Sequence, residues 1–466
     1  MAGSRRTSTS RLKFHVITNV WGERHTGLFL GMTLPNVLSQ GNLPALAAAH
    51  EVRYRIYTTP ADRARIEQSD AGKRLAKIAP IDFATPLGDR TPDVSYHVHW
   101  FHRTAAEAKR AGAVAVFIPP DTLWSDGTLR RCGEVMAQGF KAVATPFLQV
   151  SAETCLPEVL ERFAGPDGSL CIPPADLADL GRRHLHPLTA AAMPASPHSR
   201  PALEMYWPVA GEGILSRFAV RELFAFDPRR CPITFLWYAG GSEDTKGIYF
   251  SSRPHDMAML SVDPLEKYFV NYIVGHTVQP GDLVRSTLHP WNDTNQTRAF
   301  TRQRIYWHGM RKTPASWRRA EAQSDLAMRE VEVRRTAQRL WKKLREIGCE
   351  RAAGILALAL ESTAMARRWR EEVPLTIFVP SDWALGAYRA QVDPLLVPGN
   401  ESELIRWLKR HVVAGHVRRW PGQSVALDGS QVRIQFGKGV RACGKRIARA
   451  SWLDGIRIYV INGVLP

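Results

Sequence analysis

Hydrophobic and polar residues between positions 13 and 150 alternate in a way that predicts strands and helices in turn. Short apolar runs predict strands at 14–20, 51–58, 113–118 and 140–144. Helical spacing of apolar residues predicts helices at 26–38, 60–78 and 127–138. Residues 95–100 fit either a third strand or the start of a helix that continues to residue 111. The alternation predicts an α/β domain with a doubly wound, mainly parallel sheet, which binds ligands at the carboxyl ends of its strands.

The last third of the chain has its own pattern. Leu375–Val379 is typical of a strand buried on both faces; Pro380 ends it, and Ser381 or Asp382 can cap a following helix. Apolar residues at helical spacing from 404 to 413 predict a helix that ends at Gly415. The sequence 427–430 predicts a hairpin turn between strands at 424–427 and 431–436.

Three blocks in this region resemble the signatures of fasciclin domains, in the family's order. They are Thr376–Asp382 (TIFVPSD), His411–Gly415 (HVVAG) and Val460–Pro466 (VINGVLP). The sequence departs from the family in two places: Arg410 stands where a Tyr is usual, and one leucine of the closing block is missing. The resemblance implies an α+β fasciclin domain over 337–466 that binds or positions a partner. His411 is expected to be a core histidine bonded to backbone, because it lies on or beside an apolar face.

The composition is strongly basic, with a formal charge of +18 and a pI of about 9.9. This favours polyanionic partners such as nucleic acid or anionic lipid surfaces, or it reflects an Arg-rich proteome. No basic and aromatic recognition motif accompanies the charge, so sequence-specific nucleic-acid binding is not expected.

Six scattered cysteines without a Cys-x-x-Cys pair indicate neither a zinc site nor a disulfide framework. Residues 1–12 are basic and polar and are expected to form a disordered tail rather than a secretory signal. No apolar run is long enough to span a membrane, so a cytoplasmic protein, peripheral to a membrane at most, is expected.

The first predicted strand-to-helix turn lacks the G-x-G-x-x-G fingerprint and the Walker lysine pattern, which disfavours a Rossmann dehydrogenase or a P-loop ATPase. Three passages resemble the nucleotide-sugar half of GT-A-type glycosyltransferases: FHVITNVWGERHTGLFLGMTLPNVLSQGNLPAL, VRYRIYTTPADRARIEQS and VAVFIPPDTLWSDG. The family's Asp-x-Asp is missing, because Thr122 and Leu123 follow Asp121. The resemblance covers about 13–310 and fades after residue 190.

Two carboxylates are candidate ligands for a divalent metal, Mn²⁺ or Mg²⁺. Asp121 follows an apolar strand, where the resembled enzymes bind a metal that bridges the nucleotide diphosphate, and Asp126 lies in the same loop. The alternative for Asp126 is a turn with Gly127 that caps the next helix.

Asn19, Trp21 and Glu23 follow the first strand, where the resemblance implies contact with base and ribose; Trp21 is also an ordinary core aromatic. Arg182 and Arg183 would suit a phosphate, but cations are also common where helices end.

His255 and Asp256 follow an apolar strand and are candidates for a catalytic acid or base. Further polar residues are open to substrate contact or plain packing. They are His97, His99 and His102, then His184 and His186, and the stretch with Asp282, His289 and Asp293.

The expected organisation is a basic tail over 1–12, a GT-A-like domain over 13–310, a basic helical linker over 311–336 and a fasciclin domain over 337–466. The expected reaction transfers a sugar from a nucleotide sugar to a glycan or lipid-linked acceptor. The alternative is a non-catalytic scaffold in which the fasciclin domain makes protein or surface contacts. Non-specific binding to polyanions is a third option.

Overall fold

The computed structural model describes most of the chain. It covers residues 11–85, 94–193, 198–199, 204–218, 224–231, 247–253, 255–265, 273–274, 302–308, 314–361, 374–397, 399–417, 421–437, 439–453 and 455–466. The chain divides into two compact units, 1–326 and 327–466. Helix α13 (Pro314–Glu346) begins in the first unit and ends in the second.

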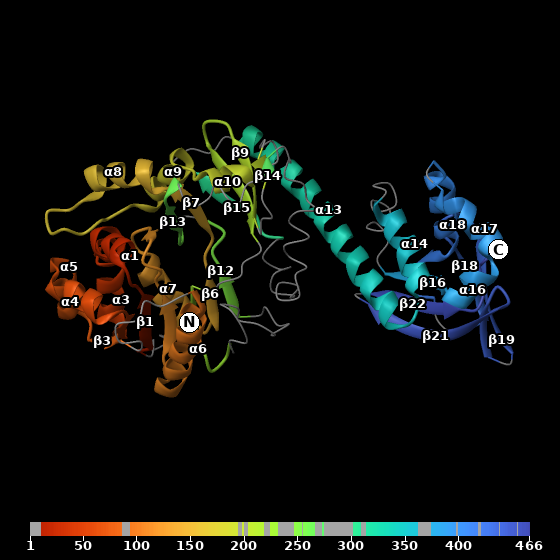
Figure 1. Cartoon of the computed structure of the whole chain (residues 1–466), viewed down its shortest axis with the longest axis horizontal. Helices are drawn as coiled ribbons and strands as arrows, with labels where there is room; N and C mark the ends of the chain where they lie inside the picture. The colour runs from red at the N-terminus through yellow and green to blue at the C-terminus, as the bar shows by residue number, and fades with distance from the viewer. Residues whose placement is uncertain are drawn as a thin grey trace, which may run out of the picture. The chain divides into compact units, whose positions relative to one another are not determined.

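A seven-stranded sheet lies at the centre of the first unit (Figure 1), in the order β12-β6-β11-β4-β1-β2-β3. Its strands are β1 (Lys13–Asn19), β2 (Glu51–Tyr57), β3 (Ile81–Ala84), β4 (Val114–Phe117), β6 (Ala142–Ala144), β11 (Ala225–Phe226) and β12 (Ile248–Phe250). Neighbouring strands are parallel except at β11, which is antiparallel to both β4 and β6. The sheet is therefore mixed, with a parallel half built from the N-terminal strands.

The helices between these strands largely follow the sequence pattern. They are α1 (Glu23–Leu28), the π-helical η1 (Phe29–Thr33), α2 (Leu34–Val37), α3 (Leu43–Ala49), α4 (Pro60–Gln68), α5 (Asp70–Ile78), α6 (Val94–Ala111) and α7 (Thr128–Ala137). Residues 94–111 are helical throughout, so the strand alternative for 95–100 is wrong. The single helix expected over 60–78 is two helices, because the Oγ of Ser69 accepts the Gly72 N–H at 3.0 Å and caps α5.

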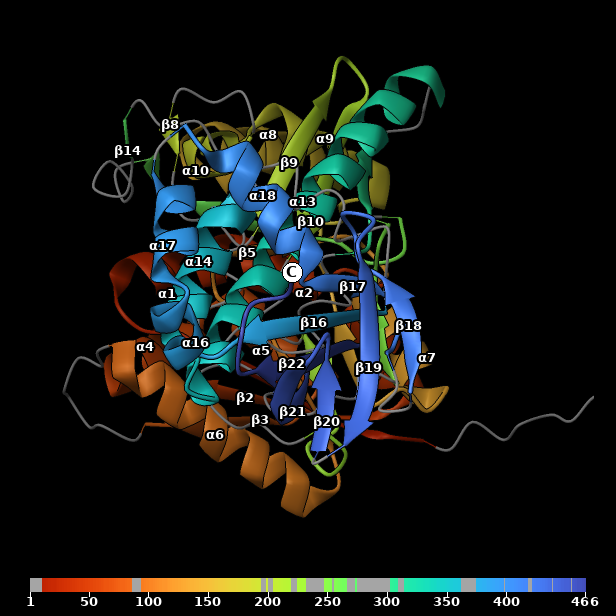
Figure 2. The same cartoon turned by 90° about the vertical axis from the view of Figure 1, so that its right-hand side faces the viewer.

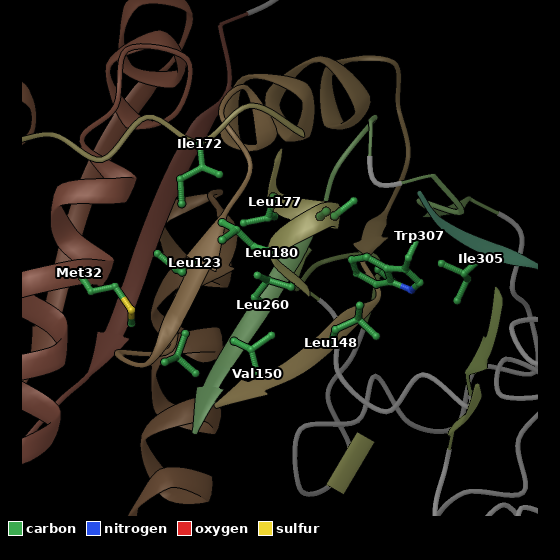
Figure 3. Packing of buried hydrophobic residues seen from close by; sticks show 14 of the residues in the cluster. Met32, Leu123, Leu148, Val150, Ile172, Leu177, Leu180, Leu260, Ile305 and Trp307 are labelled. Atoms are coloured by element: carbon green, nitrogen blue, oxygen red, sulfur yellow. The ribbon is translucent and has the colours of Figure 1, made fainter. Parts of the chain in front are cut away.

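Apolar side chains pack against both faces of this sheet. One core includes Phe14, Val16 and Leu129 and lies against η1, α2, α3 and α7. The other includes Ile17, Trp100 and Leu260 and extends to a second sheet of the unit. Figure 3 shows part of this second core, where Leu148, Leu180 and Leu260 lie together. Burial on both faces explains why the strands are nearly continuous apolar runs.

Smaller sheets complete the first unit. β5 (Thr122–Trp124), β13 (Met259–Asp263) and β7 (Phe147–Ser151) form one, β9 (Glu204–Val209), β10 (Gly213–Phe218) and β15 (Ile305–His308) form another, and β8 (His198–Ser199) pairs with β14 (Ile273–Val274). The accompanying helices are α8 (Ala152–Phe163), α9 (Pro174–Arg183) and α10 (Pro187–Ala191).

The N-terminal part of α13 is fixed to the β9-β10-β15 sheet by buried polar contacts. The indole Nε1 of Trp317 donates to Glu212 at 3.0 Å. Arg217 is only 2% exposed, and its guanidinium donates to Ser324 and to the carboxylate of Asp325. Arg304 donates to the same carboxylate. A buried arginine is therefore neutralised by a residue far away in the sequence.

The second unit contains another seven-stranded sheet, in the order β17-β16-β22-β21-β20-β19-β18. Its strands are β16 (Leu375–Pro380), β17 (Val412–Ala414), β18 (Gly422–Val425), β19 (Gln431–Gly437), β20 (Gly439–Ala442), β21 (Lys445–Leu453) and β22 (Ile456–Ile461). Its helices are the end of α13, α14 (Glu350–Glu361), α16 (Asp382–Ala387), α17 (Arg389–Val392), the 3-10 helix η3 (Asp393–Leu396) and α18 (Glu401–Arg410). The outermost strands of the sheet meet, because Val413 bridges Ala426 and the Leu427 N–H donates to the Val412 carbonyl at 2.8 Å.

Local expectations for this unit are mostly confirmed. β16 is buried throughout, Ser381 caps α16 by accepting the Ala384 N–H at 3.2 Å, and the turn at 427–430 joins β18 to β19. The helix expected over 404–413 is wrong beyond Arg410, where α18 ends. Val412 and Val413 form β17 instead, because these β-branched residues pair with β16.

Candidate ligand site at the carboxyl edge of the first sheet

The first sheet has a topological switch point between β1 and β4. The chain places β2 and β3 on one side of β1, then returns to its other side with β4, and all four strands are parallel. In open α/β sheets, ligands bind outside the carboxyl ends of the strands at such a point. The residues that follow β1 and β4 are therefore the first to consider.

Three buried polar atoms near the carboxyl ends of β1 and β2 have no hydrogen-bond partner among the described residues. They are the Oδ1 of Asn19, the Oγ1 of Thr26 and the Oγ1 of Thr58. Asn19 ends β1 and is 8% exposed, Thr58 directly follows β2, and Thr26 lies in α1 after the β1 loop. A buried polar atom without a partner costs free energy, so this group is the strongest mark of a ligand site here.

Sequence reasoning selected Asn19 but missed the two threonines. Thr58 carries a weak signal, because it is a polar residue at the end of a predicted strand. Thr26 carries none, since a threonine in the first turns of a helix is ordinary.

Hydrogen bonds fix the loop between β1 and α1. The Val20 N–H donates to the Tyr57 carbonyl at 2.9 Å, and the Gly22 N–H donates to the Asp62 carboxylate at 2.9 Å. Trp21 in this loop is half-buried, and Glu23 is exposed in the first turn of α1. Trp21 thus follows β1 on a loop that is held in place, and Glu23 begins the helix after that loop.

Asp121 lies in the loop after β4, at the same edge as Asn19. The hydroxyl of Thr33 fixes this loop, lying 2.8 Å from the Pro120 carbonyl oxygen and 2.9 Å from that of Thr122. Asp121 is half-buried, and its backbone carbonyl accepts the Val262 N–H at 2.8 Å. Asp121 therefore follows β4 on a loop that is held in place, and its binding of a cation stays a prediction.

Asp126 is held by residues of the loop between α2 and α3. Its Oδ1 accepts the Ser39 hydroxyl at 2.7 Å and the Gly41 N–H at 3.0 Å. A Cβ on Gly41 would lie 2.4 Å from the Asp126 Oδ2, so any other residue there would force the Asp126 side chain to shift. Asp126 and Gly127 form the expected turn, which confirms that part of the alternative. The N-cap of α7 is Gly127 without any side-chain cap, so the expected capping by Asp126 is wrong. That Asp126 helps to bind a divalent metal stays a prediction.

His255 and Asp256 follow β12, whose carboxyl end lies at the same sheet edge. β12 is three strands away from β4 in the sheet, about 14 Å at the usual strand spacing. Asp256 accepts hydrogen bonds from the Arg131 Nε at 2.7 Å and from the Tyr249 hydroxyl, which ties its loop to α7 and β12.

His255 follows the same strand and lies beside a second histidine, His308. Burial, then the neighbouring His308 and Arg253, lower the pKa of His255, and its ring centroid lies 4.8 Å from that of His308. Its imidazole is neutral at pH 7, as a general base requires.

Arg182 and Arg183 end α9, and their guanidiniums bind carboxylates. Arg182 donates to Asp179 at 2.7 Å, and Arg183 donates to Asp179 and to Glu158. These ion pairs occupy both cations, and their role toward a phosphate stays a prediction.

The two histidines that follow α9 have structural partners. His184 Nε2 lies 2.8 Å from Glu158, which accepts further bonds from Arg183. His186 is fully buried and caps α10 by accepting the Leu188 N–H at 3.1 Å.

Several expected site residues lie outside the described part of the chain. These are the side chains of His97 and His99, and the residues Asp282, His289 and Asp293. His102, on α6, is half-buried. Among the residues that the structure describes, no group of three or more His, Cys, Asp or Glu side chains could hold a metal ion. In the same residues, no helix is long and apolar enough to cross a membrane.

Two of the solved structures to which this chain is similar show weak likenesses. One is the mannosyltransferase PcManGT from Pyrobaculum calidifontis, solved with GDP-Man and Mn²⁺; identity is 14%, coverage 78% of this chain and 84% of that chain, and the TM-score 0.30. The other is a FAS1 domain pair from the insect cell adhesion molecule fasciclin I, at 14% identity and a TM-score of 0.22. That likeness covers 26% of this chain and 46% of the insect chain, so it spans less than half of that structure. Both TM-scores are too low to assign a fold or a function to this chain.

Comparison with curated proteins finds no match. The comparison with family models is decisive for the second unit alone. The fasciclin model matches residues 353–466, which contain all three sequence blocks and the strands from β16 to β22. Residues 353–466 of this chain are a fasciclin domain.

Proposed function

We propose that the first unit binds a nucleotide sugar at the β1–β4 switch point and transfers its sugar to a glycan or lipid-linked acceptor. The observation that carries this proposal is the coincidence, at one sheet edge, of unpartnered buried polar atoms with the carboxylate of Asp121. In this proposal the unit is a GT-A-like domain, consistent with its parallel β3-β2-β1-β4 half and antiparallel β11.

The polar groups after β1 and β2 have the chemistry to bind a nucleoside. An amide oxygen accepts hydrogen bonds from a base or a ribose hydroxyl, and threonine hydroxyls donate or accept. Because one side-chain oxygen in each of Asn19, Thr26 and Thr58 is buried without a partner among the described residues, a nucleoside would supply hydrogen bonds that these atoms lack there. Half-buried Trp21 would supply a flat surface beside them.

Asp121 has the chemistry to hold a divalent cation with the diphosphate. Mn²⁺ or Mg²⁺ needs only one or two protein carboxylates when phosphate oxygens and water fill its other positions, so the single carboxylate fits. Such a cation neutralises charge that grows on the departing diphosphate. His255, neutral at pH 7, is the proposed base for the acceptor hydroxyl.

Calorimetry with UDP, GDP and CDP in the presence of Mn²⁺ tests the proposal. At least one nucleotide is expected to bind, and Asp121→Asn is expected to weaken binding at least about fivefold by removing a charged ligand. Asn19→Ala should weaken nucleotide binding with or without metal. The matched control is Asp176→Asn, which changes a carboxylate on α9 that pairs with Arg162. Failure of all three nucleotides to bind would refute the proposal.

A fasciclin domain supports a second role, in adhesion or protein contact. If the first unit binds no nucleotide, a scaffold that acts through these contacts becomes the better proposal. Capture of the same partner by the full chain and by its Asp121→Asn variant would support that alternative.

A further inference from the structure

One exposed face of the second unit gathers arginine and glutamine side chains. It belongs to the strands β18–β21, seen in Figure 2, whose opposite face buries Val432, Ile434 and Ala442. We call it the arginine face and define it by its exposed residues: Gln423, Gln431, Arg433, Gln435, Arg441 and Arg446.

Strand register brings the charges of the arginine face together. Gln423 is paired with Arg433, Gln435 with Arg441, and Arg441 directly with Arg446. Arg433 lies two residues before Gln435 on the same strand, so it is a diagonal neighbour of Arg441. Like charges directly opposite each other on neighbouring strands destabilise a sheet. Folding alone therefore gives no reason for this arrangement.

No internal carboxylate offsets these charges in the described part of the second unit. Three other exposed arginines there do have such partners: Arg345 lies near Glu350, Arg389 bonds Asp393 and Arg406 bonds Glu403. The arginine face keeps only a bond from Arg441 to the Gly444 carbonyl, at 2.9 Å. Its guanidiniums are thus available to an external anion.

The neighbouring side chains indicate what kind of anion fits. Glutamine amides both donate and accept hydrogen bonds, which suits hydroxyl groups, while guanidiniums pair with carboxylate or sulfate. Trp452 of β21 lies on the opposite face, because the register shift after Ile447 aligns it with Arg457. The described arginine face therefore offers no aromatic platform for bases, and Val425 is its single exposed large hydrophobic side chain for insertion into a lipid surface.

We propose that the arginine face binds an anionic polysaccharide. Arg433, Arg441 and Arg446 pair with its carboxylate or sulfate groups, and the glutamines bind its hydroxyls. The proposal rests on the second unit alone and holds whether or not the first unit is a transferase.

The test compares two variants of the full chain that lose the same charge. R433Q/R441Q/R446Q removes the arginine face, and R345Q/R389Q/R406Q removes three arginines that have carboxylate partners. Binding to heparin, polygalacturonate, neutral dextran, duplex DNA and phosphatidylserine vesicles is measured at about 150 mM salt, where exposed charges are largely screened. Heparin or polygalacturonate is expected to bind, with at least ~10-fold loss in the first variant and less than ~2-fold in the control.

Three results would overturn the proposal: no binding to either polysaccharide, equal losses in the two variants, or tighter binding to DNA or vesicles than to polysaccharide. Thermal unfolding of each variant checks that the fold is retained. If the triple variant does not fold, Arg441→Gln alone serves, with an expected loss of at least ~2-fold. An unchanged affinity in that variant would equally refute the proposal.

Discussion

The Nε2 of His411 accepts a hydrogen bond from the backbone N–H of Leu465 at 3.1 Å. This bond joins the end of α18 to the segment that follows β22. Its Nδ1 lies 3.0 Å from the Trp407 carbonyl oxygen, and the side chain is 2% exposed. The two bonds fit a neutral ring that donates from Nδ1 and accepts at Nε2. This confirms the core histidine expected from sequence.

Stability of the second unit should fall in mild acid because of His411. Burial lowers the pKa of His411 to about 4, whereas the unfolded chain titrates near 6.5. The unfolded state therefore binds the extra proton first, and the stabilising contribution, complete above pH 6.5, is lost as pH falls toward 4. The expected loss is about 3 kcal/mol at pH 4.

Hydrogen exchange of the β16, β17 and β22 amides in the full chain would measure this effect. Protection should drop between pH 6.5 and 4.5 after correction for intrinsic exchange. His411→Gln should be less protected at pH 7 and lose this pH dependence, while His416→Gln, at an exposed position, should keep it. Equal pH dependence in all three proteins would contradict the prediction.

Gly41→Ala should destabilise the first unit. The added Cβ would lie 2.4 Å from the Asp126 carboxylate, which also holds Ser39, so the loop must move. We expect a cost of about 1–3 kcal/mol, measured by chemical denaturation.

The control for that substitution is Gly27→Ala. Gly27 lies in α1 with nothing within 4 Å of an added Cβ, so alanine should be neutral or stabilise by up to about 1 kcal/mol. Indistinguishable effects of the two substitutions would show that the contact with Asp126 is unimportant.

Arg217→Met should weaken the attachment of α13 to the β9-β10-β15 sheet. It leaves the Asp325 carboxylate with Arg304 alone and removes bonds to Ser324, at an expected cost of about 2–4 kcal/mol. Thermal unfolding and proteolysis within α13 would measure it. Arg130→Met, which removes one partner of the exposed pair with Glu134 on α7, should cost less than about 1 kcal/mol.

Arg441→Gln should stabilise the second unit slightly. It removes the like-charge pair with Arg446, for an expected gain of about 0.2–1 kcal/mol that shrinks as salt is added. Denaturation at low and high salt would measure the gain. A loss of stability at low salt would mean that an unrecognised attraction holds Arg441.

Local patterns predicted the early strands and helices because each buries an apolar face set by nearby residues. β11 had no such signal, because a strand of two residues is too short to show a period. β12 (Ile248–Phe250) is the apolar strand that the sequence predicts before His255 and Asp256. The placement of Asn19 and Asp121 at one edge follows from where parallel strands end. The contact of Asp126 with Ser39 could not be predicted, because it joins residues 87 apart.

The join between Val413 and Ala426 limits how the fasciclin domain can associate. When the outer strands of a sheet have unpaired backbone groups, another chain can pair with them as an added strand, which leads to aggregation or to peptide binding. Here the two outermost strands of the sheet satisfy each other at one end, so less free backbone remains there for such pairing. This favours recognition of a partner through side chains over the addition of a strand at that end of the sheet.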